Sequence, residues 1–492
     1  MRFETCIGRL RQSDLLVEGS ASAQSSFDRL VIDSRDVGSS DCFVALKGTN
    51  VDGHLFIDKA VLNGAIAIVC ESGPAVAGPD IALVKDSRRA LAELASLMES
   101  DPASKLKVFA VTGTNGKTTV ATLVAHVLDA NNHKSGFIGT TGYRDGTHFY
   151  EAVRTTPSTV RVYELLGQML ASGCSHCSME LSSHAIDQDR IRMRDVDVAL
   201  FTNLTRDHLD YHSTFELYFA AKKKLFDELP DGAVAVVNVD DPRGKGIAAD
   251  TTGSVITFGS DDHSDVSFSI EGNELSGLDL TIDGHRRRFQ LAGTYNASNL
   301  AAAYAASRAL GLSALESIDA LSSSPPVEGR FERMQFEGGT MVIVDYAHTP
   351  DALKNVLEAT LESMRPGSTL WCIFGCGGDR DPGKRAQMGA IAERLAHKVI
   401  VTSDNPRTED PKLILDDIRQ GLLKPEDAFW EIDRRDAISR AAASMVSGDT
   451  LVLAGKGHET YQVIGTTNIH FDDREEARLA FSAELTSSKR TM

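Results

Sequence analysis

The chain has 492 residues, with 51 Lys and Arg against 69 Asp and Glu, and a formal net charge of −18. One hydrophobic core stops growing near about 250–300 residues, so we expect roughly three domains. The 42% hydrophobic content excludes a wholly disordered chain, no apolar stretch is long enough for a membrane helix, and the acidic balance argues against a nucleic-acid partner.

The cysteines and the amino terminus indicate a reducing compartment. The seven cysteines are Cys6, Cys42, Cys70, Cys174, Cys177, Cys372 and Cys376. An odd number of cysteines, mostly in apolar runs, is typical of reduced core thiols in a cytoplasmic protein. Cys174 and Cys177 form a lone C-x-x-C pair, which does not predict a zinc or redox site. The first sixteen residues lack the apolar run of a secretory signal.

Two breaks divide the chain into segments of domain size. They lie at Asp101-Pro102 and at the Pro/Ser-rich residues 322–326. We therefore expect domains at residues 1–101, 102–332 and 333–492.

Apolar runs predict the elements in chain order. The first segment reads as mixed α/β, with runs at 42–46 and 65–69. The middle segment predicts strands at 108–111, 198–201 and 233–237 and a helix at 120–128, and the last predicts strands at 341–344, 370–374, 399–402 and 451–453 and helices at 351–364 and 384–395. Such alternation predicts an α/β fold with parallel sheets and ligands at the carboxyl ends of their strands.

A glycine-rich loop lies where the strand at 108–111 should pass into a helix. Its residues are Thr112-Gly113-Thr114-Asn115-Gly116-Lys117-Thr118-Thr119. The glycines allow backbone N–H groups to face phosphate oxygens, and the helix adds its positive dipole end. Lys117 can reach the terminal phosphates and Thr118 can offer a hydroxyl to Mg²⁺. Although Val111 replaces the first glycine of the common pattern, the loop predicts nucleoside triphosphate binding.

Five motifs in order resemble the Mur ligase family across essentially the whole chain. They are residues 113–118, 179–184, 202–212, 293–299 and 345–350. The resemblance implies a UDP-binding domain, a central ATPase with a parallel sheet, and a Rossmann-like carboxyl-terminal domain. Asp33-Ser34-Arg35 and Asp404-Asn405-Pro406-Arg407 resemble the members that add meso-2,6-diaminopimelate to UDP-N-acetylmuramoyl-L-Ala-D-Glu in peptidoglycan precursor synthesis.

The resemblance implies ATP-driven amide formation through an acyl phosphate, with Mg²⁺ bound. Lys117, Glu180, His208 and Lys222 would be the catalytic residues. Thr118, Glu180, His208 and Lys222 would support the metal, with Lys222 carbamylated so that it carries an anion. Taken alone, Glu180 and His208 would more often be structural, and residues 220–224 a solvated basic patch. Asn296 and His348 match positions near the nucleotide base or ribose.

The resemblance also implies the nucleotide-sugar contacts. They are Ile32, Ser34, Thr49, Asn50, Val51, Arg154, Thr155, Thr156, Ser182, Gln188 and Arg190. Arg154 occupies the position, just before the paired threonines, where another member of the family has asparagine. The resemblance therefore does not decide whether Arg154 contacts the nucleotide-sugar.

The predicted amino-acid site distinguishes diaminopimelate from lysine by its distal carboxylate. In the loop Asp404-Asn405-Pro406-Arg407, Arg407 can bind that carboxylate, Asp404 the distal ammonium, and Pro406 can stiffen the backbone. Arg380, Gly455 and Glu459 match the remaining contacts. Outside the family frame, Asp-Asn-Pro-Arg would most simply be a turn with a surface ion pair.

Several alternative functions remain open. A lysine-adding ligase differs mainly at residues 404–407, and a folate polyglutamate-type ligase would leave about 100 amino-terminal residues unexplained. From other classes, the chain could be a nucleotide-driven switch or a non-catalytic UDP-sugar binder. We expect a cytoplasmic monomer that acts on small molecules without entering a membrane.

Overall fold

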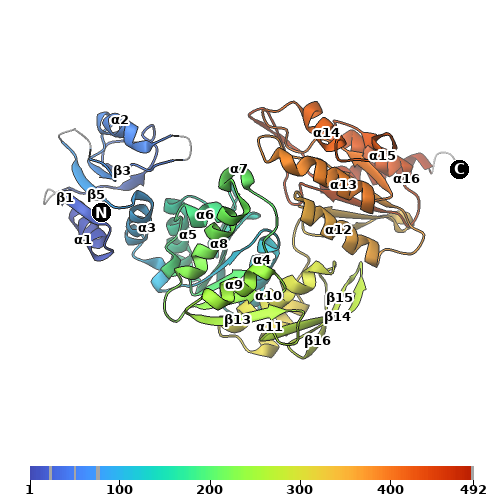
Figure 1. Ribbon diagram of the computed structural model, residues 1–492, viewed down its shortest axis with the longest axis horizontal. Helices are drawn as coiled ribbons and strands as arrows, with labels where there is room; N and C mark the ends of the chain where they lie inside the picture. Colours follow the sequence, from blue (N-terminus) through green and yellow to red (C-terminus); the bar gives the residue numbers. More distant parts are fainter. Residues whose placement is uncertain (21–24, 49–50, 74–77, 489–492) are drawn as a thin grey trace.

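The computed structural model describes residues 1–20, 25–48, 51–73 and 78–488. Figure 1 shows three α/β bodies in a row, with the amino terminus in the first and the carboxyl terminus in the third. Each body is built on one of the three larger sheets. Among these residues, we find no helix with the length and apolar character needed to cross a membrane.

The first body holds five strands in the order β1-β5-β4-β3-β2. Their bounds are β1 Leu16–Ser20, β2 Arg29–Val31, β3 Asp41–Val44, β4 Ala67–Cys70 and β5 Asp80–Val84, and the helices are α1 Phe3–Gln12, η1 Gly53–Phe56, α2 Ile57–Leu62 and α3 Ser87–Met98. The strands from β2 to β5 are parallel, and β1 is antiparallel to β5. Both predicted apolar runs contribute buried strands, β3 and β4.

The second body holds eleven strands in the order β16-β15-β14-β13-β12-β11-β6-β10-β7-β8-β9. The strands are β6 Lys107–Thr112, β7 Ser135–Gly139, β8 Gly142–Arg144, β9 Phe149–Tyr150, β10 His176–Glu180, β11 Val198–Phe201, β12 Val234–Asn238, β13 Ser254–Gly259, β14 Val266–Glu274, β15 Gly277–Ile282 and β16 His285–Phe289. The helical segments are η2 Pro102–Ser104, α4 Lys117–Ala130, α5 Thr159–Ala171, α6 Ser183–Asp187, η3 Met193–Asp195, α7 Leu209–His212, α8 Phe215–Asp227, α9 Pro242–Asp250, α10 Tyr295–Ala309 and α11 Ala314–Ser322.

This sheet is parallel only from β7 to β14, which confirms the predicted parallel centre. Both edges are antiparallel, formed by β8 and β9 on one side and β15 and β16 on the other. The pair Asp283-Gly284 joins β15 to β16 with both residues at positive φ, 49° and 75°. An Asp-Gly pair is a common hairpin turn signal, but this antiparallel edge was not predicted from the sequence.

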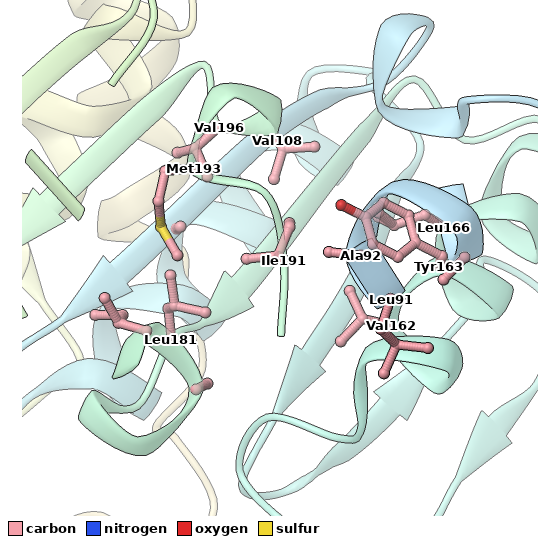
Figure 2. Close-up of a cluster of buried hydrophobic side chains, with 14 of the residues drawn as sticks. Leu91, Ala92, Val108, Val162, Tyr163, Leu166, Leu181, Ile191, Met193 and Val196 are labelled. Carbon is pink, nitrogen blue, oxygen red and sulfur yellow. The ribbon is translucent and has the colours of Figure 1, made fainter. Parts of the chain in front are cut away.

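Side chains of β6 alternate between two cores, because a central parallel strand is covered on both faces. Val108 packs in one cluster and Phe109 in the other. The first cluster continues into the amino-terminal body, where Leu91 and Ala92 of α3 approach Val162 of α5 (Figure 2). A shared apolar core therefore holds the first two bodies against each other.

The third body holds six strands in the order β17-β18-β22-β19-β20-β21, all parallel except β17. Its strands are β17 Glu332–Gln335, β18 Met341–Asp345, β19 Leu370–Phe374, β20 Lys398–Val401, β21 Phe429–Trp430 and β22 Thr450–Ala454, and a separate hairpin comprises β23 Tyr461–Ile464 and β24 Thr467–His470. The helical segments are η4 Glu337–Gly339, α12 Pro350–Ser363, η5 Pro382–Lys384, α13 Arg385–Leu395, α14 Pro411–Arg419, η6 Pro425–Asp427, α15 Arg434–Ser444 and α16 Asp473–Ser488.

Reducing agents should leave activity unchanged. All seven cysteines are free and buried, and burial raises the pKa of the Cys6, Cys372 and Cys376 thiols to about 12. A buried neutral thiol is a poor nucleophile. We expect equal turnover with and without excess dithiothreitol, and inactivation by the reductant would contradict this account.

Candidate functional site

The phosphate loop connects the end of β6 to the first turn of α4. Gly113 and Gly116 have φ values of 148° and 86°, which side-chain-bearing residues rarely adopt. A Cβ on Gly113 would also overlap the Thr202 hydroxyl. The loop is fixed to the end of β11 by Asn203, whose carbonyl accepts from Thr114 N at 2.8 Å and whose side chain accepts from Asn115 N at 2.9 Å.

Lys117 lies folded over this loop. Its ammonium donates to the carbonyls of Gly113 and Thr114 at 2.9 and 2.8 Å, and burial lowers its pKa. The loop lines a cavity of about 280 Å³. Other walls of this cavity, which we call the nucleotide cavity, include Glu180, His208, Lys222, Ser298, Asn299, Arg330 and His348. The structure therefore brings together most of the predicted catalytic and nucleotide residues.

Glu180 ends β10 with its side chain fully buried. Its carboxylate accepts from Thr118 Oγ1 at 3.0 Å and from Thr140 N and Oγ1 at 2.7 and 3.1 Å. Carboxylate and hydroxyl oxygens are donors that Mg²⁺ prefers when phosphate oxygens complete its shell. Across the described residues, no three His, Cys, Asp or Glu side chains are arranged to hold a metal ion by themselves, without phosphate oxygens. The oxygen pair of Thr118 and Glu180 fits a cation shared with phosphate.

Lys222 is a buried amine on α8, not part of a solvated patch. Its Nζ donates to Gly113 O at 2.8 Å and lies 4.5 Å from the centre of the Tyr218 ring. Burial holds its pKa well below the usual value. His208 lies nearby at φ 54°, with its ring 4.9 Å from that of His184, and burial lowers its pKa as well.

A second cavity, of about 970 Å³, lies between the first and second bodies. Its walls include the predicted nucleotide-sugar residues Ile32, Ser34, Val51, Arg154, Thr155, Thr156, Ser182, Gln188 and Arg190, while Thr49 and Asn50 lie outside the described residues. We call it the nucleotide-sugar cavity. Thr155, Ser182 and His208 line both cavities, so the two meet at these side chains.

The three predicted amino-acid loops converge beyond the strands of the third body. Gly378 N donates to Asn405 O at 2.9 Å, and Arg407 Nη1 donates to Gly378 O at 2.7 Å. Asn405 Nδ2 donates to Glu459 Oε2 at 2.9 Å. Arg380 lines the nucleotide-sugar cavity and also borders this group, since a Cβ on Gly377 would lie 3.9 Å from Arg380 Cγ and 2.9 Å from Arg407 Nη1.

Asp404 and Glu459 share a buried cation. Lys456 Nζ lies 3.2 Å from Glu459 Oε2 and 3.9 Å from Asp404 Oδ1, and its side chain is fully buried. Burial and the Asp404 charge raise the pKa of Glu459. Gly455 adjoins this pair, since a Cβ there would lie 2.7 Å from Asp404 Oδ2. The loops thus present both acidic and basic groups.

Sequence reasoning missed Arg330. It donates from Nη2 to Thr118 Oγ1 at 2.8 Å and its guanidinium lies 4.6 Å from the centre of the Tyr346 ring. Its Nε is buried without a hydrogen-bond partner in the described structure. The side chain enters the nucleotide cavity from the loop before β17, over two hundred positions from the phosphate loop, and no local motif marks it.

The polar contacts that join the phosphate-loop body to the third body include one from the phosphate loop and one from the segment after β11. Asn115 Nδ2 donates to Asp351 Oδ2 at 2.9 Å, and Arg206 pairs with Asp381 at 3.4 Å. Sequence reasoning did not identify either contact. They place the third body's α12 directly beside the nucleotide cavity.

Of the two residues predicted to lie near the nucleotide base or ribose, His348 lines the nucleotide cavity and Asn296 does not. His348 lines the nucleotide cavity and its Nδ1 is 2.8 Å from Tyr346 O. Asn296 is buried in α10, where Nδ2 donates to Ala292 O and Oδ1 accepts from Asn299. Its neighbours Ser298 and Asn299 line the cavity instead.

Three family models match the chain in succession. The model described as Mur ligase family, catalytic domain, matches residues 27–99. Mur ligase middle domain matches residues 111–307, and Mur ligase, glutamate ligase domain, matches residues 329–457.

Individual proteins match over nearly the full length. The UDP-N-acetylmuramoyl-L-alanyl-D-glutamate–2,6-diaminopimelate ligase of Parabacteroides distasonis is 44% identical over 460 residues, 92% of this chain and 94% of that protein. The ligase of the same name from Listeria innocua is 40% identical over 488 residues, 97% and 98% of the two chains. A solved structure of a ligase with that name aligns at TM-score 0.66 and 33% identity, covering 93% of this chain and 95% of the other. The MurF ligase from Thermotoga maritima in complex with ADP shares the fold, with TM-score 0.63 and 22% identity over 95% of this chain and 100% of the other.

Proposed function

Because the chain belongs to the Mur ligase family, we propose that it joins meso-2,6-diaminopimelate to the D-glutamyl γ-carboxylate of UDP-N-acetylmuramoyl-L-Ala-D-Glu. The reaction converts ATP to ADP and phosphate and builds a peptidoglycan precursor. Relatives that carry this activity in their names are 40–44% identical over more than 90% of the chain. The structural observation that carries the proposal is the junction of the two cavities at Thr155, Ser182 and His208.

The proposed chemistry has two steps that suit this junction. The γ-carboxylate oxygen attacks the γ-phosphorus of ATP, the bond to ADP breaks, and an acyl phosphate forms. The amine of the amino acid then attacks the acyl carbon, phosphate leaves, and the amine loses a proton. Lys117, Arg330 and the positive end of α4 offset the charge that gathers when anionic oxygens meet.

We propose that Thr118 and Glu180 hold Mg²⁺ together with phosphate oxygens, with His208 and a modified Lys222 in support. When bound, the ion would neutralise phosphate charge. The amino acid would then be held by Arg407 at its distal carboxylate and by Asp404 and Glu459 at its ammonium, with Arg380 and Gly455 beside it.

Carbamylation of Lys222 is a testable part of this proposal. Its buried amine has a depressed pKa and is therefore a nucleophile toward CO₂. We expect ¹³C-bicarbonate to give a carbamate resonance in the wild type, and Lys222→Ala to lose that resonance together with about 100-fold or more of turnover. Lys223→Ala is the matched control, since Lys223 on the same helix pairs with Asp227 at the surface. An unchanged resonance in Lys222→Ala would exclude the assignment.

The requirement for substrates separates a ligase from a nucleotide-driven switch. We expect phosphate release only when ATP, Mg²⁺, the nucleotide-sugar dipeptide and the amino acid are all present. Omission of either non-nucleotide substrate should reduce the rate to background. A switch or motor would instead release phosphate from ATP alone, and that result would overturn the ligase proposal.

We also propose that residues 1–101, 102–332 and 333–492 form the three domains, supported by one large sheet in each body, although β17 of the third sheet begins at Glu332, one residue before the third range. We further propose that the enzyme works as a monomer in the cytoplasm, where ATP is supplied.

A further inference from the structure

The hairpin of β23 and β24 stands apart from the three large sheets. Its side chains are half-buried or exposed from Tyr461 to His470, and Ile464 and Ile469 are each 48% exposed. A two-stranded hairpin without a packed apolar face is marginal by itself. Its hydrogen bonds to other parts of the chain therefore matter to its position.

Several of those hydrogen bonds go to the Asp404–Arg407 loop. Arg407 N donates to Val463 O at 3.1 Å, and Gly465 N donates to Arg407 O at 2.8 Å. Arg407 has a φ of 51°, a left-handed conformation that costs free energy for a residue with a side chain. The hairpin thus forms hydrogen bonds with both the N–H and the carbonyl of this strained residue.

The hairpin also bonds the first half of the loop. Val463 N donates to Asn405 Oδ1 at 2.9 Å, and Gln462 Nε2 donates to Asp404 O at 2.5 Å. The Gln462 bond is made by a side chain, so it can be removed without altering the hairpin backbone. Gln462 itself is half-buried beside the loop.

We infer that Gln462 is a positioning residue that holds the Asp404–Arg407 loop in the geometry that selects diaminopimelate over lysine. This inference rests on the proposed function. Asp404 and Arg407 stand at opposite ends of a four-residue loop, and they must face the ammonium and carboxylate of one distal centre. A shift of about 1 Å in either would weaken that paired contact.

The test compares Gln462→Ala and Gln462→Glu with the wild type in phosphate-release kinetics. Gln462→Ala should raise the KM for meso-diaminopimelate about tenfold, the value of one lost hydrogen bond, with kcat and the KM values for ATP and the nucleotide-sugar within twofold. Gln462→Glu keeps the size but sets a carboxylate against the Asp404 carbonyl, so its KM should rise at least as much. In both variants the kcat/KM ratio of diaminopimelate to lysine should fall.

Asn468→Ala is the matched control, because Asn468 is exposed on the partner strand, opposite Val463. It should leave all three KM values unchanged. An unchanged KM for diaminopimelate in both Gln462 variants would overturn the inference, as would equal losses for all three substrates, which indicate general damage to the fold. Failure of the wild type itself to use diaminopimelate would instead refute the proposed function.

Discussion

Lys117→Ala should reduce phosphate release by roughly a thousandfold or more. The Lys117 ammonium is folded over the phosphate loop, donating to two of its carbonyls, where it can turn toward terminal phosphates. Alanine removes the charge but keeps the helix, because alanine has the best helix propensity. The measurement is steady-state phosphate release with all substrates saturating.

Lys107→Ala is the control for Lys117→Ala. Lys107 begins the same strand, β6, at its other end, where it pairs with Asp197 at 2.9 Å on the surface. It should retain wild-type turnover. Unchanged turnover in Lys117→Ala would contradict the assignment of the phosphate loop.

Arg407→Ala should raise the KM for diaminopimelate while leaving the KM for ATP close to the wild-type value. Loss of a charge-assisted contact to a carboxylate costs about 2–5 kcal/mol, or about 30- to several-thousandfold. Arg407→Lys keeps the charge but loses the planar fork, so it should recover only part of the affinity. The measurement is the dependence of initial rate on each substrate in turn.

Lys398→Ala serves as the control for the Arg407 variants. Lys398 is exposed at the start of β20, the strand that leads to the amino-acid loop. It should leave the KM for diaminopimelate unchanged. A negligible effect of Arg407→Ala would remove Arg407 from the site and favour a ligase with another amino-acid preference.

Local patterns predicted the elements that carry the phosphate loop. The apolar run at 108–111 and the glycines after it correspond to β6 and the loop before α4, although the helix begins at Lys117 and not at Val120. The predicted strands at 198–201 and 370–374 match β11 and β19 residue for residue. Buried parallel strands give continuous apolar runs, which is why these were readable.

Features that depend on distant contacts could not be predicted in the same way. Arg330 reaches Thr118 only because the loop before β17 folds back beside the phosphate loop, and its sequence neighbourhood carries no nucleotide motif. The hairpin that includes Gln462 consists of half-buried and exposed side chains, so it lacks the apolar alternation that marks a strand. Lys222 lies in a basic run typical of a solvated face, and only the packing of Tyr218 and Gly113 around it reveals a buried amine.

The most direct test of the proposed reaction is a competition experiment. The enzyme is incubated with ATP, Mg²⁺, UDP-N-acetylmuramoyl-L-Ala-D-Glu and equal amounts of meso-diaminopimelate and L-lysine. Mass spectrometry then identifies which amino acid the nucleotide-sugar product carries. We predict that the product carries diaminopimelate almost exclusively. A product that carries mainly lysine would contradict the reading of the Asp404–Arg407 loop, and no amide product with either amino acid would contradict the proposed function.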